Sequence, residues 1–320
     1  MEVWSAAVAR ARRVPGDWQP GDPALREKAL RVQTDMVSTR FEPRDSSELF
    51  SAIFTWWSIL DSVMVSKLGG NYASGYVREL QLRRMVQLVQ TPQTNRYCEI
   101  GMNGGHSVVA MLEANRNLTA DVFDLMAWSY SADVGRLLST RFGSRFRLHR
   151  GDSKLRVPAL AKSGHLNGTC DLLFIDGNHH PKGVRDDLLN CRRIAAPGAR
   201  LVIDDVAVSS KTQPGPVVAL RQMEAAGVVR VHERYGTFPG GHYYNPCMRK
   251  PASDARYTKT RTMQFCIPWG FAVGVYDPVQ QFNSSWTSAS IMAAGALTPD
   301  LLLEGDFGQP LHAHQHVSRS

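Results

Sequence analysis

The chain has 320 residues, a hydrophobic fraction of 43% and a formal net charge of +8. This length allows one large domain with extensions or two domains, and the composition is sufficient for a sizeable core. The positive charge is spread along the sequence instead of forming a basic tail, which indicates a solvated surface and does not favour a nucleic-acid partner.

Cysteine spacing and the length of the apolar segments argue against a zinc-binding protein and against a membrane-spanning protein. The five cysteines lie far apart and form no C-x-x-C pair, so we expect no zinc site and free thiols in a reducing, cytoplasmic compartment. The N-terminus lacks the apolar core of a signal peptide, although its arginines leave an organelle transit peptide open. The most apolar stretch, 49–60, is shorter than the roughly 20 residues that span a bilayer, so we expect no membrane span.

We expect the first 74 residues to form an N-terminal extension. Residues 1–45 show weak periodicity, and Ser46 to Glu48 can cap a buried helix over about 46–67. A second helix is predicted over 75–90, where the apolar residues suggest one buried stripe.

From residue 96 onward, strand-like and helix-like segments alternate. Strands are predicted over 96–100, 120–125, 146–151, 170–176 and 199–206, and helices over 106–116, 132–142, 154–163, 183–195 and 216–226. This alternation predicts an α/β fold with a Rossmann-like, doubly wound and mostly parallel sheet, with helices on both faces.

Two more strands follow, at "VVRVHERY" and at 271–278, and we expect the last one to be antiparallel. The main domain is therefore placed at 75–280, with an inserted loop at 236–268 whose length suggests a functional role. Residues 281–320 form a predicted C-terminal extension with a mobile tail.

Acidic residues stand at the carboxyl ends of all five predicted strands up to residue 206. They are Glu99, Asp124, Asp152, Asp176 and the pair Asp204 and Asp205. Ligands of open parallel sheets bind beyond these strand ends, and acids at the edge of a core are costly unless something pairs with them. The series indicates a cation-rich or hydroxyl-rich ligand along this edge.

The glycines after the first strand suggest how that ligand binds. Gly101 permits a tight turn, and Gly104 and Gly105 would let the backbone approach a ligand before the helix begins at His106. The spacing is G-x-x-G-G and not G-x-G-x-x-G. Glu99 would repel a pyrophosphate but attract an ammonium or sulfonium group. A simple turn is the alternative interpretation.

The next two acids extend this hypothesis. Asp124 suits ribose hydroxyls, and Asp152 could accept a hydrogen bond from an adenine amino group. A cofactor with ribose, adenine, an ammonium and a sulfonium is S-adenosylmethionine. Either aspartate could instead cap the helix that follows it.

The segment 96–206 resembles the class I S-adenosylmethionine-dependent methyltransferases. "CEIGMNGG" looks like their first motif, "VFDL" like the second and "RGDS" like the adenine-side motif. The block "LLFIDGNHHPKGVRDDLLNCRRIAAPGARLVIDDV" is similar to small-molecule O-methyltransferases of sugar and macrolide type, including metal-dependent members. The resemblance implies a transferase with these cofactor-binding residues: Glu99, Gly101, Asn103, Gly104, Gly105, Ser107, Asp124, Asp152, Ser153 and Asp176.

Three acids from two neighbouring strand ends suggest a metal site. Asp176, Asp204 and Asp205 would repel one another unless they share a cation, so we expect a divalent ion such as Mg²⁺, which could lower the pKa of an acceptor hydroxyl. His179 and Asp176 are the candidate catalytic residues, with His179 as the base, although His179 could be an ordinary loop histidine. The sugar-modifying members carry an acid where this chain has Asn178 and His179.

The favoured function is methyl transfer from S-adenosylmethionine to a hydroxyl of a small-molecule acceptor, assisted by a divalent cation. The alternatives are metal-free transfer to nitrogen, carbon or a carboxylate, and a non-catalytic basic module that binds nucleic acid on the same fold. The sequence names neither the acceptor nor the oligomeric state.

Overall fold

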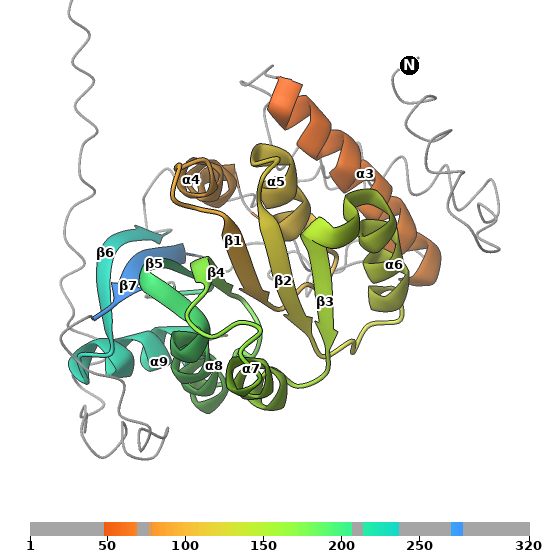
Figure 1. Ribbon diagram of the computed structural model, residues 1–320. Coiled ribbons are helices and arrows are strands. Elements are labelled where there is room, and N and C mark those ends of the chain that lie inside the picture. The colour runs from red at the N-terminus through yellow and green to blue at the C-terminus, as the bar shows by residue number, and fades with distance from the viewer. Residues whose placement is uncertain (1–47, 69–76, 78, 207–213, 237–269, 278–320) are drawn as a thin grey trace, which may run out of the picture.

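The computed structural model describes residues 48–68, 77, 79–206, 214–236 and 270–277, and its centre is a seven-stranded sheet in the order β3-β2-β1-β4-β5-β7-β6 (Figure 1). The strands are β1 Arg96–Ile100, β2 Thr119–Asp124, β3 Phe146–Arg150, β4 Cys170–Ile175, β5 Ala195–Ile203, β6 Val229–Gly236 and β7 Gly270–Tyr276. Strands β1 to β5 pair in parallel, and β7 is antiparallel to both β5 and β6. The predicted fold class, including the antiparallel last strand, is confirmed.

Helices cover both faces of the sheet. They are α3 Glu48–Leu68, α4 Glu79–Val89, α5 His106–Ala114, α6 Ser131–Phe142, α7 Ser153–Lys162, α8 Pro181–Ile194 and α9 Pro214–Ala225, with a short 3-10 turn η1 at Gly143–Arg145. Figure 1 shows α3 to α6 on one face and α7 to α9 on the other. Among the described helices, none is both long and apolar enough to pass through a bilayer.

The alternation of side chains along β1 divides the core into two layers. Tyr97 packs in the apolar cluster beneath α3 to α6, whereas Cys98 and Ile100 pack in the cluster beneath α7 to α9. Because side chains alternate across a strand, Glu99 lies on the same face as Tyr97. Glu99 is therefore directed beneath α5 and away from the α8 layer.

The predicted elements agree closely with those observed between residues 96 and 206. The largest difference is β5, which begins at Ala195 and not at 199 because the chain passes directly from α8 into the strand. The lead-in over 1–45, the inserted loop beyond Gly236 and the C-terminal extension over 281–320 lie outside the described residues, so these domain assignments stay predictions.

Two cysteines are not free thiols. Cys98 on β1 and Cys170 on β4 form a disulfide, with their Cα atoms 5.9 Å apart and a sequence separation of 72. The expectation of free thiols is therefore wrong for this pair, because parallel pairing of β1 with β4 brings together residues that are distant in sequence. Cys191 is free and buried.

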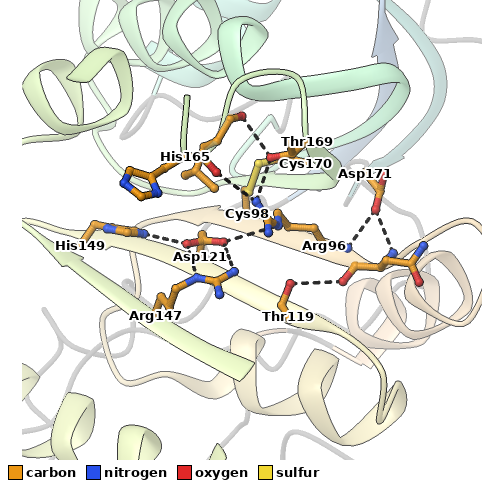
Figure 2. Close-up of polar contacts among 12 residues, drawn as sticks. Arg96, Cys98, Thr119, Asp121, Arg147, His149, His165, Thr169, Cys170 and Asp171 are labelled. Atoms are coloured by element: carbon orange, nitrogen blue, oxygen red, sulfur yellow. Dashed lines mark hydrogen bonds and ion pairs between the residues drawn. A yellow bond between two sulfur atoms is a disulfide. The ribbon is translucent and has the colours of Figure 1, made fainter. Parts of the chain in front are cut away.

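A buried carboxylate ties the first three strands together (Figure 2). Asp121 on β2 accepts hydrogen bonds of 2.9 Å from Nε and Nη2 of Arg147 and forms one of 2.8 Å with Nε2 of His149. Arg96 on β1 approaches it at 3.8 Å. Burial opposes the charge of Asp121, but the contacts with His149 and Arg147 outweigh it and lower the pKa of Asp121 to about 2.

Candidate active site

The carboxyl ends of β1 to β5 meet at one edge of the sheet, which we call the acidic rim. The pairing registers place Ile100 beside Phe123 and Ile175, and Ile175 beside Ile203. The ends of these strands and the segments that follow them carry the predicted site residues, so the parallel topology itself brings the acids together.

Glu99 is fully buried at this rim. The Ser107 hydroxyl on α5 donates a hydrogen bond to its Oε1 atom, while Oε2 has no hydrogen-bond partner among the described residues. Burial raises the pKa of Glu99 to about 8, although contacts with Ser107 and Tyr97 oppose the shift. A buried carboxyl group with one unsatisfied oxygen is suited to a cationic ligand group.

Gly101 is required by two independent constraints. Its φ is +96°, in the region that favours glycine, and a Cβ there would overlap the backbone carbonyl of Asp176. The turn after β1 therefore presses directly on the end of β4. This contact places the glycine loop beside the predicted metal residues.

The other two glycines of this loop pack against protein side chains. A Cβ at Gly104 would overlap Met64 of α3 and crowd His106, and one at Gly105 would crowd Leu138 of α6. Their small size therefore allows the surrounding helices to pack closely. Close approach of the backbone to a ligand at these positions stays a prediction.

Asp124, at the end of β2, organises two loops of the rim. Its Oδ2 accepts a hydrogen bond of 2.9 Å from the Asn103 amide, and its Oδ1 accepts one of 2.6 Å from the Met126 amide. The Tyr130 hydroxyl donates to the Asn103 side chain. Asp124 thus holds the glycine loop in place, and it does not cap α6, whose N-cap residue is Tyr130.

Asp152 and Ser153 serve as structural residues at the start of α7. Asp152 is the N-cap of this helix and accepts a hydrogen bond of 3.0 Å from the Lys154 amide. Ser153 donates one of 2.6 Å to the buried Asp187 of α8. The capping alternative for Asp152 is confirmed, and contact of either residue with a cofactor stays a prediction.

Asp187 is a buried acid that the sequence analysis missed. Burial raises its pKa to about 6, while Ser153 and the backbone of Asn178 oppose the shift. The Asp187 carboxylate also lies close to Gly177. This residue therefore supports the loop after β4, and the only signal in the sequence was an acid at a helix position that faces the sheet.

Asp176, His179 and Asp205 form a compact group of possible metal ligands. One ligand atom from each lies within 4.8 Å of the others. Nε2 of His179 is 3.6 Å from Oδ1 of Asp176, and its Nδ1 is 3.3 Å from Oδ2 of Asp205. Contact with Asp176, together with the charges of Asp205 and Asp204, raises the pKa of His179 to about 9. The imidazole is therefore cationic at neutral pH.

Asp204, the third predicted ligand, does not belong to this group. Its side chain is buried, and its Oδ1 accepts a hydrogen bond of 2.8 Å from the Asp205 amide. Burial, and next the charges of Asp176 and Asp205, raise the pKa of Asp204 well above its usual value. His179 is therefore the third member of the compact group, and a metal-ligand role for Asp204 stays a prediction.

Strained backbone is concentrated at the acidic rim. In the described part of the chain, three residues other than glycine have a positive φ: Asn103 at 47°, Met126 at 62° and Asp205 at 58°. They follow β1, β2 and β5 respectively. Such conformations cost free energy and are typical of functional sites.

Exposed apolar side chains lie beside the same loops. Three large hydrophobic residues are exposed among those described: Leu125 and Trp128 after β2, and Leu155 near the start of α7. Leu125 follows Asp124 directly, and Leu155 lies three residues after Asp152. Apolar side chains flanking polar anchors are typical of a small-molecule site.

Comparison with protein families identifies the central segment. Residues 98–206 match the sequence model of a family described as a methyltransferase domain. The match begins in β1, ends just after β5 and contains all the predicted site residues. A comparison with curated proteins finds no match.

Solved structures share the fold at low sequence identity. The O-methyltransferase TomG from Streptomyces achromogenes, involved in tomaymycin synthesis and solved in complex with SAM, is 18% identical with a TM-score of 0.50, and the match covers 77% of this chain and 96% of TomG. An O-methyltransferase from Bacillus cereus in complex with SAH is 15% identical with a TM-score of 0.50, covering 77% of this chain and 97% of its own.

Proposed function

We propose that this chain, a methyltransferase with the fold of the class I S-adenosylmethionine-dependent enzymes, transfers a methyl group to a hydroxyl of a small molecule with the help of a divalent cation. The observation that carries the proposal is the group formed by Asp176, His179 and Asp205. This group lies against the glycine loop through the contact of Gly101 with the Asp176 backbone.

The acidic rim supports the cofactor part of the proposal. The unsatisfied Oε2 of Glu99 can accept a hydrogen bond from the cofactor ammonium, and the Asp124 oxygens retain lone pairs for ribose hydroxyls. Leu125 and Leu155 offer apolar surface for adenine. The two structural relatives described above were solved with SAM or SAH, which agrees with this assignment.

The donor atoms fit a divalent cation. Two carboxylates and one imidazole satisfy an ion such as Mn²⁺, whereas Mg²⁺ prefers oxygen ligands alone. The proposal therefore keeps Asp176 and Asp205 from the predicted set and replaces Asp204 with His179. When bound, the cation would polarise the acceptor hydroxyl and lower its pKa.

The residues of the chain mainly hold and orient the reactants. The sulfonium supplies the leaving group, so the protein contributes chiefly by aligning the acceptor oxygen with the methyl carbon. His179 is protonated at neutral pH in the metal-free protein, and it must lose this proton before it can bind a cation or accept the proton of the acceptor.

Metal-free transfer is a second candidate, and the same histidine favours it. The His179 imidazolium lies 3.6 Å from Asp176 and 3.3 Å from Asp205, so it can neutralise the two acids without an ion. In that case Asp176 and Asp205 would hold His179 beside the acceptor as a charged, hydrogen-bonding group.

A turnover assay with and without chelator separates the two candidates. Purified protein would be dialysed against EDTA and incubated with methyl-labelled S-adenosylmethionine and a panel of phenols, catechols and sugars, with mass-spectrometric detection of methylated product. The proposal predicts product only after a divalent cation is restored, with Mn²⁺ more effective than Mg²⁺, and at least a hundredfold loss in Asp176→Asn.

The matched control is Glu113→Gln, which removes a surface carboxylate that pairs with Arg141 at 3.1 Å. Its activity should equal that of the wild type. Full turnover in excess EDTA would show that the reaction needs no cation, and the metal-free candidate would then be the function that remains.

A further inference from the structure

The glycine loop is held by a helix that lies outside the matched methyltransferase segment. Helix α3 spans Glu48–Leu68, whereas the match begins at residue 98. Figure 1 shows α3 beside α5 on the same face of the sheet. The contacts between these helices converge on His106, the first residue of α5, which directly follows the glycines.

Two polar side chains of α3 hold His106. Oδ1 of Asp61 is 2.9 Å from Nε2 of the imidazole, and the side chains of both residues are almost fully buried, at 3% and 1% exposure. Nε1 of Trp57 donates a hydrogen bond of 2.9 Å to the His106 backbone carbonyl. The Trp57 ring also packs edge-on against the imidazole, with centroids 5.5 Å apart.

These contacts fix the orientation of the imidazole. A carboxylate can only accept, so the hydrogen of the imidazole is assigned to Nε2 and directed at Asp61. The buried Nδ1 has no hydrogen-bond partner among the described residues. The orientation of His106 is thus set by α3 and not by the matched domain.

Apolar packing continues from His106 into the loop itself. Met64, one turn after Asp61 on α3, fills the space that a side chain at Gly104 would need, and Cε1 of His106 crowds the same space. Met102, also in the loop, is buried in the cluster that contains Met64. The Gly104 position is therefore enclosed by α3 and by the histidine that α3 holds.

We propose that Trp57 and Asp61 are positioning residues for the cofactor, which act through His106 to hold the glycine loop in its binding conformation. The inference rests on the proposed function, because it takes the loop as part of the S-adenosylmethionine site. It adds that cofactor affinity depends on the helix that precedes the matched domain.

The energetic argument concerns preorganisation. Positive φ angles at Gly101 and Asn103 give the loop a conformation that needs support from its surroundings. If α3 supplies this support before the cofactor binds, the free-energy cost of ordering the loop does not reduce the binding affinity. Loss of the support should therefore weaken binding without changing any group that touches the cofactor.

Calorimetric titration with S-adenosylhomocysteine tests the proposal. Trp57→Phe keeps an aromatic ring but removes the donor to the His106 carbonyl, and His106→Leu removes the contact with Asp61. We expect the Kd to rise about tenfold for Trp57→Phe and by more for His106→Leu. His106→Gln places an amide donor near the position of Nε2 and should restore most of the affinity.

A destabilised helix could also weaken binding, so a matched variant is needed. Ile53→Val trims a fully buried side chain one turn before Trp57 on the same helix. It should lower the melting temperature as much as Trp57→Phe does while leaving the Kd within about twofold of the wild type. If His106→Leu does not fold, the Kd values of Trp57→Phe and His106→Gln, compared with that of Ile53→Val, still test the positioning role.

The outcomes separate the two proposals. Wild-type protein that binds S-adenosylhomocysteine, with an unchanged Kd in Trp57→Phe and His106→Leu, would overturn the positioning role alone. Equal weakening in Ile53→Val and Trp57→Phe would do the same, because it would reduce the effect to general stability. Absence of binding by the wild type would overturn the proposed function and this inference with it.

Discussion

The two oxygens of the Glu99 carboxyl group differ in their hydrogen bonding. Its Oε1 accepts a hydrogen bond from Ser107, whereas Oε2 is buried without a partner in the described structure. Because burial raises its pKa to about 8, the group is mostly protonated in the free protein at neutral pH. A cofactor ammonium would favour the charged form, so binding is coupled to loss of this proton.

Cofactor affinity should therefore depend on pH in a defined direction. The pKa of Glu99 is raised in the free protein and falls in the complex, so affinity rises as the pH increases from about 6 towards 8. Calorimetry at pH 7 in two buffers of different ionisation enthalpy should detect close to one proton released per S-adenosylmethionine bound. Glu99→Gln should release fewer protons and bind roughly tenfold to a hundredfold more weakly. Equal proton release by the wild type and Glu99→Gln would show that Glu99 is not the group that loses a proton when the cofactor binds.

At the scale of elements, the first three strands depend on one carboxylate. Asp121 joins β2 to Arg147 and His149 of β3 and approaches Arg96 of β1, and Figure 2 shows these side chains converging on it. Truncating one partner of such a buried ionic group leaves charges uncompensated, which is more costly than losing a surface pair.

Asp121→Asn should reduce the free energy of unfolding by about 2.6 kcal/mol at pH 7, given a folded pKa of about 2 against about 3.9 in the unfolded chain. A lowered carboxyl pKa stabilises the fold above pH 4, and this contribution is lost as the pH falls towards 2. Urea unfolding at pH 7 and at pH 3 should show the difference between the two proteins shrinking. Glu224→Gln, which removes a surface pair with Arg234, should cost less than about 1 kcal/mol at either pH. A pH-independent difference for Asp121→Asn would contradict the account.

At the scale of the whole molecule, the disulfide between Cys98 and Cys170 closes a long loop in the unfolded chain. The sequence separation is 72 residues, which corresponds to a loop-closure contribution of about 4 kcal/mol in the chain-entropy model. Dithiothreitol should therefore lower the free energy of unfolding of the wild type. The double variant Cys98→Ala and Cys170→Ala should already be less stable and should show no response to the reductant at these positions. A wild type whose stability is the same in both conditions would show that the bond is absent in solution.

The sheet could be predicted from the sequence, since the segments of β1 to β5 alternate with helical segments and each has an acid within two residues of its carboxyl end. The disulfide could not be predicted, because five widely spaced cysteines allow many pairings and only the fold places Cys98 and Cys170 on neighbouring strands. The packing role of Gly104 could not be predicted for a similar reason. Its neighbour Met64 belongs to α3, and docking of a helix distant in sequence leaves no local signal.

The sequence could not show which of two adjacent acids belongs to the compact group of possible metal ligands. Asp204 and Asp205 are consecutive and follow Ile203, the last residue of β5. The left-handed backbone of Asp205, with φ at 58°, directs its carboxylate to within 3.3 Å of His179, while Asp204 is buried. No sequence pattern specifies that conformation, so the sequence alone could not show that Asp205 lies beside His179.

Anomalous diffraction from crystals grown with Mn²⁺ and S-adenosylhomocysteine tests the central claim most directly, because it locates cofactor and cation in one measurement. The account predicts S-adenosylhomocysteine along the acidic rim beside Glu99 and Asp124, and one manganese peak among Asp176, His179 and Asp205 at ligand distances of about 2.0–2.3 Å. A cofactor bound away from the rim, or crystals with the rim occupied and no manganese at these three side chains, would contradict it.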